Sequence, residues 1–287
     1  MSEIKHVNLP YQASLLSFFS AVRDLPYPAL LDSNHEHFPD TNFDILVANP
    51  LARVHPTQNS QPITWYSTPL YELSNTDNPM TLLNELMSLI CQESWAKSAP
   101  KDWPFIGGLL GYYGYESGHF VEQLPDTVKH DIRLETLSIG LYSWAVITSH
   151  QKKTTQLIIS PWCPSADVAD LINRFTSACD DVLVKHELNE ARPFHLQAPF
   201  TSNMTEDEYA QKFAAVQDYI QSGDCYQVNL AQRFSTRYQG DTFTAYHTLR
   251  DVCPTPFSAY MEFSPEQSVL SHSPERFLLC DQGRVES

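Results

Sequence analysis

The clearest pattern of hydrophobic and polar positions lies between residues 205 and 223 and predicts a helix. Thr205 and Glu208 have the spacing of a capping box, in which each side chain bonds the backbone N–H of the other residue. Apolar side chains then recur at helical spacing, at Tyr209, Phe213, Val216 and Ile220. Gly223 supplies the stop signal, because glycine readily adopts the left-handed conformation that ends many helices.

Directly after this glycine the period changes to two, which predicts a strand over residues 225–233. Tyr226, Val228 and Leu230 share one face, which we expect to be the core face. The other face carries Gln227 and Asn229. Because a buried amide without partners costs about 1–3 kcal/mol, these two side chains need water, a protein network or a ligand. The spacing alone favours a solvated strand face.

Similar patterns along the rest of the chain predict a mixture of helices and strands. Helical spacing marks residues 11–25, 81–97, 166–186 and 243–252, and strand patterns mark residues 29–32, 43–48, 63–67, 105–113, 138–148, 154–160, 257–263, 268–272, 277–280 and 284–285. Few connections signal a parallel crossover. We therefore expect an α+β fold in which antiparallel sheets pack face to face with helices outside.

A polar stretch at residues 189–203 contains Pro193 and Pro199, lacks periodicity and indicates a domain boundary or a crossover. We expect an amino-terminal region over residues 1–200 and a second domain over residues 201–287. The chain stops within a predicted strand, so we expect the second domain, and with it the fold, to be incomplete.

Composition narrows the class of protein without naming an activity. The chain has 287 residues, of which 42% are hydrophobic, and this is enough for a sizeable core. Its formal net charge of −16 argues against nucleic-acid binding, which needs clustered Lys and Arg. The amino terminus has no signal-peptide pattern, and no apolar run approaches the roughly 20 residues of a membrane span. A cytoplasmic protein without membrane contact is expected.

Cysteine and histidine spacing gives no sign of a metal site. The six cysteines contain no Cys-x-x-Cys pair, which predicts reduced thiols. His35 and His37 flank Glu36, but alternate residues supply at most two imidazoles on one side, and no nearby residue completes a ligand set. An exposed loop is the better interpretation, and we expect no metal ligands within the chain.

Five of the nine glycines fall in one window, at Gly107, Gly108, Gly111, Gly114 and Gly118. The window lacks a Gly-x-Gly-x-x-Gly or Gly-Lys-Ser/Thr motif, so a nucleotide site is not indicated. Glycines within a strand more often mark a bulge or close backbone packing, which is the interpretation that we adopt.

Three segments resemble the enzymes that aminate chorismate, and most closely the aminodeoxychorismate synthase component I family. They are residues 104–116, residues 219–234, and residues 270–278 with the motif Ser-Pro-Glu-Arg-Phe. The sister family, anthranilate synthase component I, is similar in all three. It usually has Ile-Phe-Gln-Val-Val where this chain has Cys-Tyr-Gln-Val-Asn at residues 225–229. The resemblance therefore favours the aminodeoxychorismate branch.

This resemblance implies conversion of chorismate and ammonia to 4-amino-4-deoxychorismate, for para-aminobenzoate and folate biosynthesis, with a glutamine amidotransferase partner that supplies the ammonia. It assigns Glu275 as the general acid/base at the chorismate C4 hydroxyl, a role that needs a carboxyl tuned by burial. Gln227 and Asn229 would face the active site.

The same resemblance implies further groups that this sequence does not contain. The nucleophilic lysine of the family, its Mg²⁺ ligands and its glycine-rich substrate loop would follow Ser287, and Lys212 is the last lysine in the chain. We therefore expect a truncated amino-terminal portion of the enzyme that does not by itself turn over chorismate.

A tryptophan pocket is also implied by the resemblance, at Ser33, Asp40, Thr41, Asn42, Phe43, Pro256, Phe257 and Ser258. In the aminodeoxychorismate branch the bound tryptophan is expected to be structural. Feedback enzymes usually have Leu-Leu-Glu-Ser where this chain has Leu-Leu-Asp-Ser at residues 30–33, which leaves regulation open.

Two alternatives to the aminodeoxychorismate function remain at this stage. The chain could derive from an anthranilate synthase component I, which makes a precursor of tryptophan. It could instead be a non-catalytic fragment that keeps only the tryptophan pocket.

Overall fold

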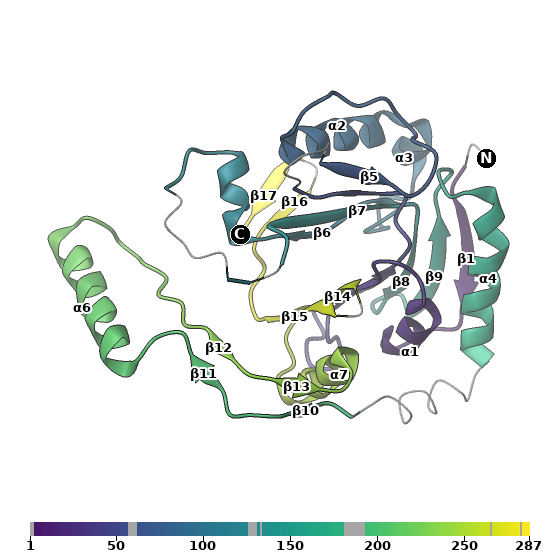
Figure 1. The fold of residues 1–287 in the computed structure, drawn as a ribbon. Coiled ribbons are helices and arrows are strands. Elements are labelled where there is room, and N and C mark those ends of the chain that lie inside the picture. Colours follow the sequence, from purple (N-terminus) through teal and green to yellow (C-terminus); the bar gives the residue numbers. More distant parts are fainter. Residues whose placement is uncertain are drawn as a thin grey trace. The chain divides into compact units, whose positions relative to one another are not determined.

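A computed structural model describes residues 3–56, 62–125, 131–132, 134–180, 193–264, 266–281 and 283–287 (Figure 1). The chain divides into two compact units. One comprises Met1–Asn189 and Tyr246–Ser287, and the other comprises Glu190–Ala245.

The larger unit contains a seven-stranded antiparallel sheet. Its strands, in spatial order, are β1 (Lys5–Leu9), β9 (Thr154–Ile159), β8 (Trp144–Ser149), β3 (Phe43–Val47), β2 (Ala29–Asp32), β14 (Phe257–Ser264) and β15 (Gln267–Ser273). Because β14 pairs directly with β2, the sheet joins residues from both ends of the chain.

A second antiparallel sheet in this unit has four strands, in the order β5 (Ile63–Trp65), β4 (Ala52–Val54), β7 (Leu137–Tyr142) and β6 (Gly108–Tyr113). Ser143 alone separates β7 from β8, and the chain passes from one sheet to the other there. The single strand predicted over residues 138–148 is therefore wrong. Every position of both strands is buried, so no change of alternation marks the corner in the sequence.

The two sheets pack against each other through a shared apolar cluster. Ile147 contributes from the seven-stranded sheet, and Leu110 and Tyr142 contribute from the four-stranded sheet. Gly111 allows β6 to approach β7 closely, because a Cβ at this position would lie 2.0 Å from the backbone oxygen of Ser138. The predicted face-to-face packing of antiparallel sheets is confirmed, as is the packing role of the glycine window.

Helices cover the outer faces of these sheets (Figure 1). α2 (Pro79–Gln92) begins at Asn78, whose side chain accepts a hydrogen bond from the Met80 N–H, and its buried Leu86 packs against Ile139 of β7. α4 (Ser165–Asp180) brings Phe175 to 5.7 Å from the ring of Trp144. The other helices are α1 (Leu16–Phe19), η1 (Ser20–Val22), α3 (Ser94–Ser98), η2 (Tyr115–Phe120) and α7 (Thr242–Val252). Within the described ranges, no helix is long and apolar enough to cross a membrane.

A hairpin follows β15 in the sequence and is formed by β16 (Leu279–Asp281) and β17 (Arg284–Glu286). Gly283 lies between the two strands with φ of 79°, as the predicted turn requires. All residues of both strands are exposed, so this hairpin adds nothing to the core.

The smaller unit consists of two short ladders and one helix. β10 (His195–Leu196) pairs with β13 (Tyr238–Gln239), and β11 (Thr201–Ser202) pairs with β12 (Phe234–Ser235). α6 (Glu206–Ser222) has the predicted capping box at Thr205 and Glu208 and ends at Gly223, whose φ is 82°. The helix prediction is confirmed in detail, although none of the residues of α6 is buried.

The strand predicted over residues 225–233 does not form. Tyr226 is fully exposed and Val228 is 43% exposed, so their side is not a core face. Alternation shows which face of a strand could be buried, but a strand also needs a hydrogen-bonded neighbour. Among the described strands, none pairs with this segment.

Candidate functional site

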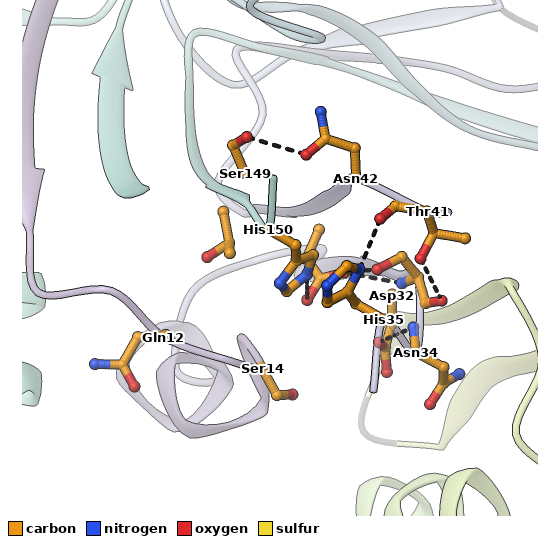
Figure 2. Close-up of polar contacts among 12 residues, drawn as sticks. Gln12, Ser14, Asp32, Asn34, His35, Thr41, Asn42, Ser149 and His150 are labelled. Atoms are coloured by element: carbon orange, nitrogen blue, oxygen red, sulfur yellow. Dashed lines mark hydrogen bonds and ion pairs between the residues drawn. The ribbon is translucent and has the colours of Figure 1, made fainter. Parts of the chain in front are cut away.

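Buried polar side chains gather in the larger unit where β2 ends and where β3 and β14 begin (Figure 2). We refer to this group as the polar network. Its members are Asp32, Ser33, Asn34, Asp44, His150, Tyr246, Arg250, Thr255 and Ser258. Each of these residues is at most 6% exposed, so each polar group depends on protein partners.

Asp44 connects Ser33 to His150. Its Oδ1 accepts hydrogen bonds from the Ser33 N–H at 2.9 Å and from the Ser33 hydroxyl at 2.7 Å. Its Oδ2 lies 3.2 Å from Nε2 of His150, and the two side chains are 2% and 0% exposed. The hydroxyl of Tyr11 lies 3.0 Å from the other ring nitrogen of His150. Asp44 therefore fixes the orientation of the Ser33 hydroxyl.

His35 stacks on His150, as Figure 2 shows, with ring centroids 4.4 Å apart and planes within 3°. Its Nδ1 lies 2.7 Å from the backbone oxygen of Thr41. Glu36 and His37 are exposed, as the loop interpretation predicts, whereas His35 is half-buried. The loop thus covers the His150 side of the polar network.

Asp32 forms a buried ion pair with Arg250 of α7. Nε of Arg250 lies 2.7 Å from Oδ2 of Asp32, which also accepts a hydrogen bond from the Tyr246 hydroxyl at 3.3 Å. Burial opposes the charge on Arg250, but the hydrogen bond and charge of Asp32 outweigh it and raise the Arg250 pKa. Burial, followed by the charge of Asp32, raises the pKa of Tyr246, which therefore stays protonated as a donor.

Asn34 joins the end of β2 to the segment before β14. Its side-chain Nδ2 donates to the backbone oxygen of Thr255 at 2.7 Å and to the Ser258 hydroxyl at 3.1 Å. Its backbone N–H donates to Oδ1 of Asp32 at 3.0 Å. Residues more than 220 positions apart in the sequence are thereby held together.

Several polar atoms of this region have no hydrogen-bond partner among the described residues. They include Oδ1 of Asn34 and both ring nitrogens of His272. His272 pairs in register with Ser258, which pairs with Asp32 on its other side, so the three side chains form one row across β15, β14 and β2. Asn34 and Arg250 both bond Asp32, so an unpartnered acceptor and a buried guanidinium lie in one network, which suits a small ligand that carries both an ammonium and a carboxylate group.

The predicted tryptophan-binding residues are placed in different surroundings. Ser33 and Ser258 belong to the polar network. Oδ1 of Asn42 accepts a hydrogen bond from the Ser149 hydroxyl at 3.0 Å (Figure 2). Phe43 packs into the apolar cluster between the sheets, on the face of β3 opposite Asp44.

The other four predicted positions lie around the rim of the polar network. Asp40 is exposed, and the Thr41 hydroxyl donates to the backbone oxygen of Phe38 at 2.6 Å. Pro256 and Phe257 are half-buried, with the guanidinium of Arg276 lying 5.1 Å from the centroid of the Phe257 ring.

The predicted catalytic residues are all exposed. Gln227 and Asn229 lie in the smaller unit, and Nε2 of Gln227 lies 3.5 Å from Oδ1 of Asn229. Glu275 is exposed in the larger unit. Glu275 is therefore not buried by the described residues, although its expected role requires burial, and its acid/base role stays a prediction.

No group of three or more His, Cys, Asp or Glu side chains that could hold a metal ion is present among the described residues. The described part of the chain therefore offers no ligand set that fits the Mg²⁺ implied by the family resemblance.

Three residues that hold the polar network together were not predicted from the sequence, namely Arg250, Asp44 and His150. Two signals were available. Asp44 interrupts the apolar run of β3, and Arg250 follows Tyr246 by one helical turn on a face of α7 that is otherwise apolar. Their partners lie far away in the sequence, so spacing alone does not reveal the pairs.

The sequence of the chain matches a known family of proteins. A family model described as "chorismate binding enzyme" matches residues 39–287, and the chain belongs to this family.

Individual relatives narrow the class further. The chain is 36% identical over 282 residues to aminodeoxychorismate synthase component 1 of Salmonella typhimurium (strain LT2), which covers 98% of this chain and 58% of the relative. It is 34% identical over 270 residues to the protein of the same name from Escherichia coli (strain K12), which covers 94% of this chain and 55% of the relative. The chain thus spans a little over half the length of these relatives.

One solved structure supports the fold alone. The crystal structure of anthranilate synthase component I from Streptococcus pneumoniae TIGR4 has a TM-score of 0.61 and 20% sequence identity, and the match covers 86% of this chain and 53% of that chain. The expected α+β architecture, similar to that of anthranilate synthase component I, is confirmed.

Proposed function

We propose that this chain provides the amino-terminal portion of an aminodeoxychorismate synthase component 1. The whole protein converts chorismate and ammonia to 4-amino-4-deoxychorismate, and a glutamine amidotransferase subunit supplies the ammonia. The observation that carries this proposal is the identity of 34–36% over 94–98% of the chain to two relatives with that name.

The chemistry of the proposed reaction asks for a proton donor at the leaving hydroxyl, since hydroxide is a poor leaving group. We assign this role to Glu275 in the complete enzyme, where Mg²⁺ would hold the substrate carboxylate. Such a donor needs a drier environment than the exposed position of Glu275 in this chain provides. We therefore expect the 287-residue chain alone to give no turnover of chorismate.

A chimeric enzyme tests the proposal. The segment of the Escherichia coli relative that aligns with this chain is replaced by this chain, and the product from chorismate and ammonium is identified by chromatography. Aminodeoxychorismate is the expected product, and Glu275→Gln in the chimera should abolish it. A folded chimera, verified by circular dichroism, that forms anthranilate instead would overturn the assignment.

The polar network supports a second function of this chain, the binding of L-tryptophan. Ser33 and Ser258 lie in the polar network together with the unpartnered Oδ1 of Asn34 and the buried guanidinium of Arg250. These groups can receive the ammonium and the carboxylate of an amino acid. Titration calorimetry with L-tryptophan tests this function, and an isolated chain that shows no saturable heat would contradict it.

A further inference from the structure

A cavity in the larger unit is separate from the polar network and has no role in the function described above. It has a volume of about 280 Å³ and lies over the ends of β3, β8 and β9, where the segment of residues 100–104 crosses the sheet. The residues that matter for its chemistry are Phe43, Trp103, Ile147, Lys152, Thr154 and Gln156. This volume is at the lower end of the range for small-molecule sites, about 300 Å³, and suits a single substituted ring.

The floor and one wall of the cavity are apolar. Phe43 and Ile147 belong to the apolar cluster between the sheets, and Trp103 packs against the same cluster. The ring of Trp103 is held edge-on by His6 of β1, with centroids 5.5 Å apart and planes at 65°. An aromatic ligand would therefore meet positioned side chains at little cost in side-chain entropy.

An ion pair between Lys152 and Asp102 forms part of the lining of the cavity. These side chains are 55% and 50% exposed, and such surface pairs contribute about 0–1 kcal/mol. A ligand carboxylate can take the place of Asp102 on Lys152 with little loss, because the released carboxylate of Asp102 returns to water.

The lining of the cavity carries one cation, Lys152, and one carboxylate, Asp102. The neighbouring Lys153 is turned toward Tyr11, with its Nζ 3.3 Å from the Tyr11 hydroxyl and 4.9 Å from the centroid of the Tyr11 ring. Lys152 is therefore the cation that an anionic ligand in the cavity would meet.

The remaining polar groups of the lining have fixed roles or face water. The Ser149 hydroxyl donates to Asn42 at 3.0 Å and accepts from the Lys152 N–H at 3.3 Å. The side-chain nitrogen of Gln156 donates to Asn8 at 2.8 Å. Lys152 is thus the cationic group of the lining that a ligand can reach.

We propose that this cavity binds a small planar aromatic carboxylate, with its ring against Trp103 and Phe43 and its carboxylate on Lys152. The site differs from the polar network, because Phe43 and Asp44 are consecutive strand residues and point to opposite faces of β3.

Calorimetry on the 287-residue chain with sodium benzoate as the probe tests the proposal. Benzoate should give saturable binding, and both Lys152→Gln and Trp103→Leu should weaken it roughly tenfold, since a charge-assisted hydrogen bond or a ring contact is lost. Lys212→Gln on exposed α6 is the matched control and should leave benzoate binding unchanged. Asp102→Asn should tighten binding, because it removes the competing carboxylate.

Two further probes separate the contributions of charge and shape. Benzamide, which has the ring without the charge, and cyclohexanecarboxylate, which has the charge without the flat ring, should both bind more weakly than benzoate. The proposal is overturned if benzoate shows no saturable binding, if Lys152→Gln and Trp103→Leu bind it as the parent chain does, or if benzylamine binds in preference to it.

Discussion

Nε of Arg250 lies 2.7 Å from Oδ2 of Asp32, and the two side chains are 7% and 1% exposed. The pair links the last residue of β2 to helix α7, so it ties together parts of the chain that are 218 positions apart. A buried ion pair contributes less to stability than its geometry suggests, because both charged groups lose their hydration. Removing one partner, however, leaves the other charge buried and unpaired.

Removing one partner of this pair should therefore be costly. Arg250→Met is expected to lower the free energy of unfolding by about 3–5 kcal/mol, because it leaves the buried carboxylate of Asp32 uncompensated. Urea denaturation monitored by circular dichroism measures the change. The control is Arg174→Gln on α4, which removes an exposed pairing with Asp24 and Asp170 and should cost about 1 kcal/mol or less.

The double variant Asp32→Leu/Arg250→Met should recover much of this loss, because no buried charge is left unpaired. A double variant as unstable as Arg250→Met would show that the cost comes from packing.

His272 should make the stability of the protein depend on pH. Burial, only partly opposed by the charge of Asp32, lowers the pKa of His272 below its ordinary value. In the unfolded chain the imidazole has a pKa of about 6.5, so below that pH the unfolded chain binds the proton more readily than the folded chain does. Stability is therefore expected to fall as pH drops from about 6.5 through the lower pKa of the folded state.

The variant His272→Phe keeps a ring against Tyr246 and removes this proton uptake. Between roughly pH 7.5 and pH 5, a range that spans the ordinary pKa of imidazole, its unfolding midpoint in urea should fall less than that of the parent chain. His247→Gln, at an exposed position of α7, should retain the parent dependence. Identical slopes for His272→Phe and the parent would refute the assignment.

Ser33 should be required for the proposed tryptophan binding. Ser33→Ala removes the hydroxyl that Asp44 orients, and we expect the affinity for L-tryptophan to fall roughly tenfold, because the ligand ammonium would lose an oxygen that accepts its hydrogen bond. Titration calorimetry gives the affinity. Ser74→Ala, which removes an exposed hydroxyl bonded to Glu85, is the matched control and should bind as the parent does.

Gly111 should tolerate no side chain. Gly111→Ala would bring a Cβ to 2.0 Å from the Ser138 carbonyl oxygen and should separate β6 from β7, with a loss of about 3 kcal/mol or more. Thermal unfolding measures the loss. At Gly223, φ is 82°, and a Cβ added there would have no contact within 4 Å outside the adjoining backbone. Gly223→Ala should therefore cost only what the left-handed conformation costs a residue other than glycine, about 1–2 kcal/mol. Equal losses at the two sites would contradict the crowding argument.

Much of the fold could be predicted from local patterns. The helix at Glu206–Ser222 was given by its capping box and terminal glycine, and the order of helices and strands gave the antiparallel α+β architecture. The corner at Ser143 could not be predicted, because two fully buried strands on either side read as one apolar run. Residues 225–233 do not form a strand because no described strand pairs with them, and the alternation of apolar and polar residues does not show whether a partner strand is present.

The candidate site could be predicted only in part, and with the aid of the family resemblance. Ser33 and Ser258, which that resemblance named together, both lie in the polar network. Asp44 pairs with His150 and Asp32 pairs with Arg250, and the partners in each pair are more than 100 positions apart in the sequence. Local residue spacing cannot predict contacts between such distant positions.

The seven-stranded sheet ends at β15, which has a paired neighbour on one side only among the described strands. Its seven residues include no Asp, Glu, Lys, Arg or Pro, the residues that usually prevent an edge strand from pairing with a strand of another molecule. Any strand that joined this edge would extend the row of Asp32, Ser258 and His272 by one more side chain. Such a neighbour would place a side chain next to His272, whose two ring nitrogens have no hydrogen-bond partner among the described residues.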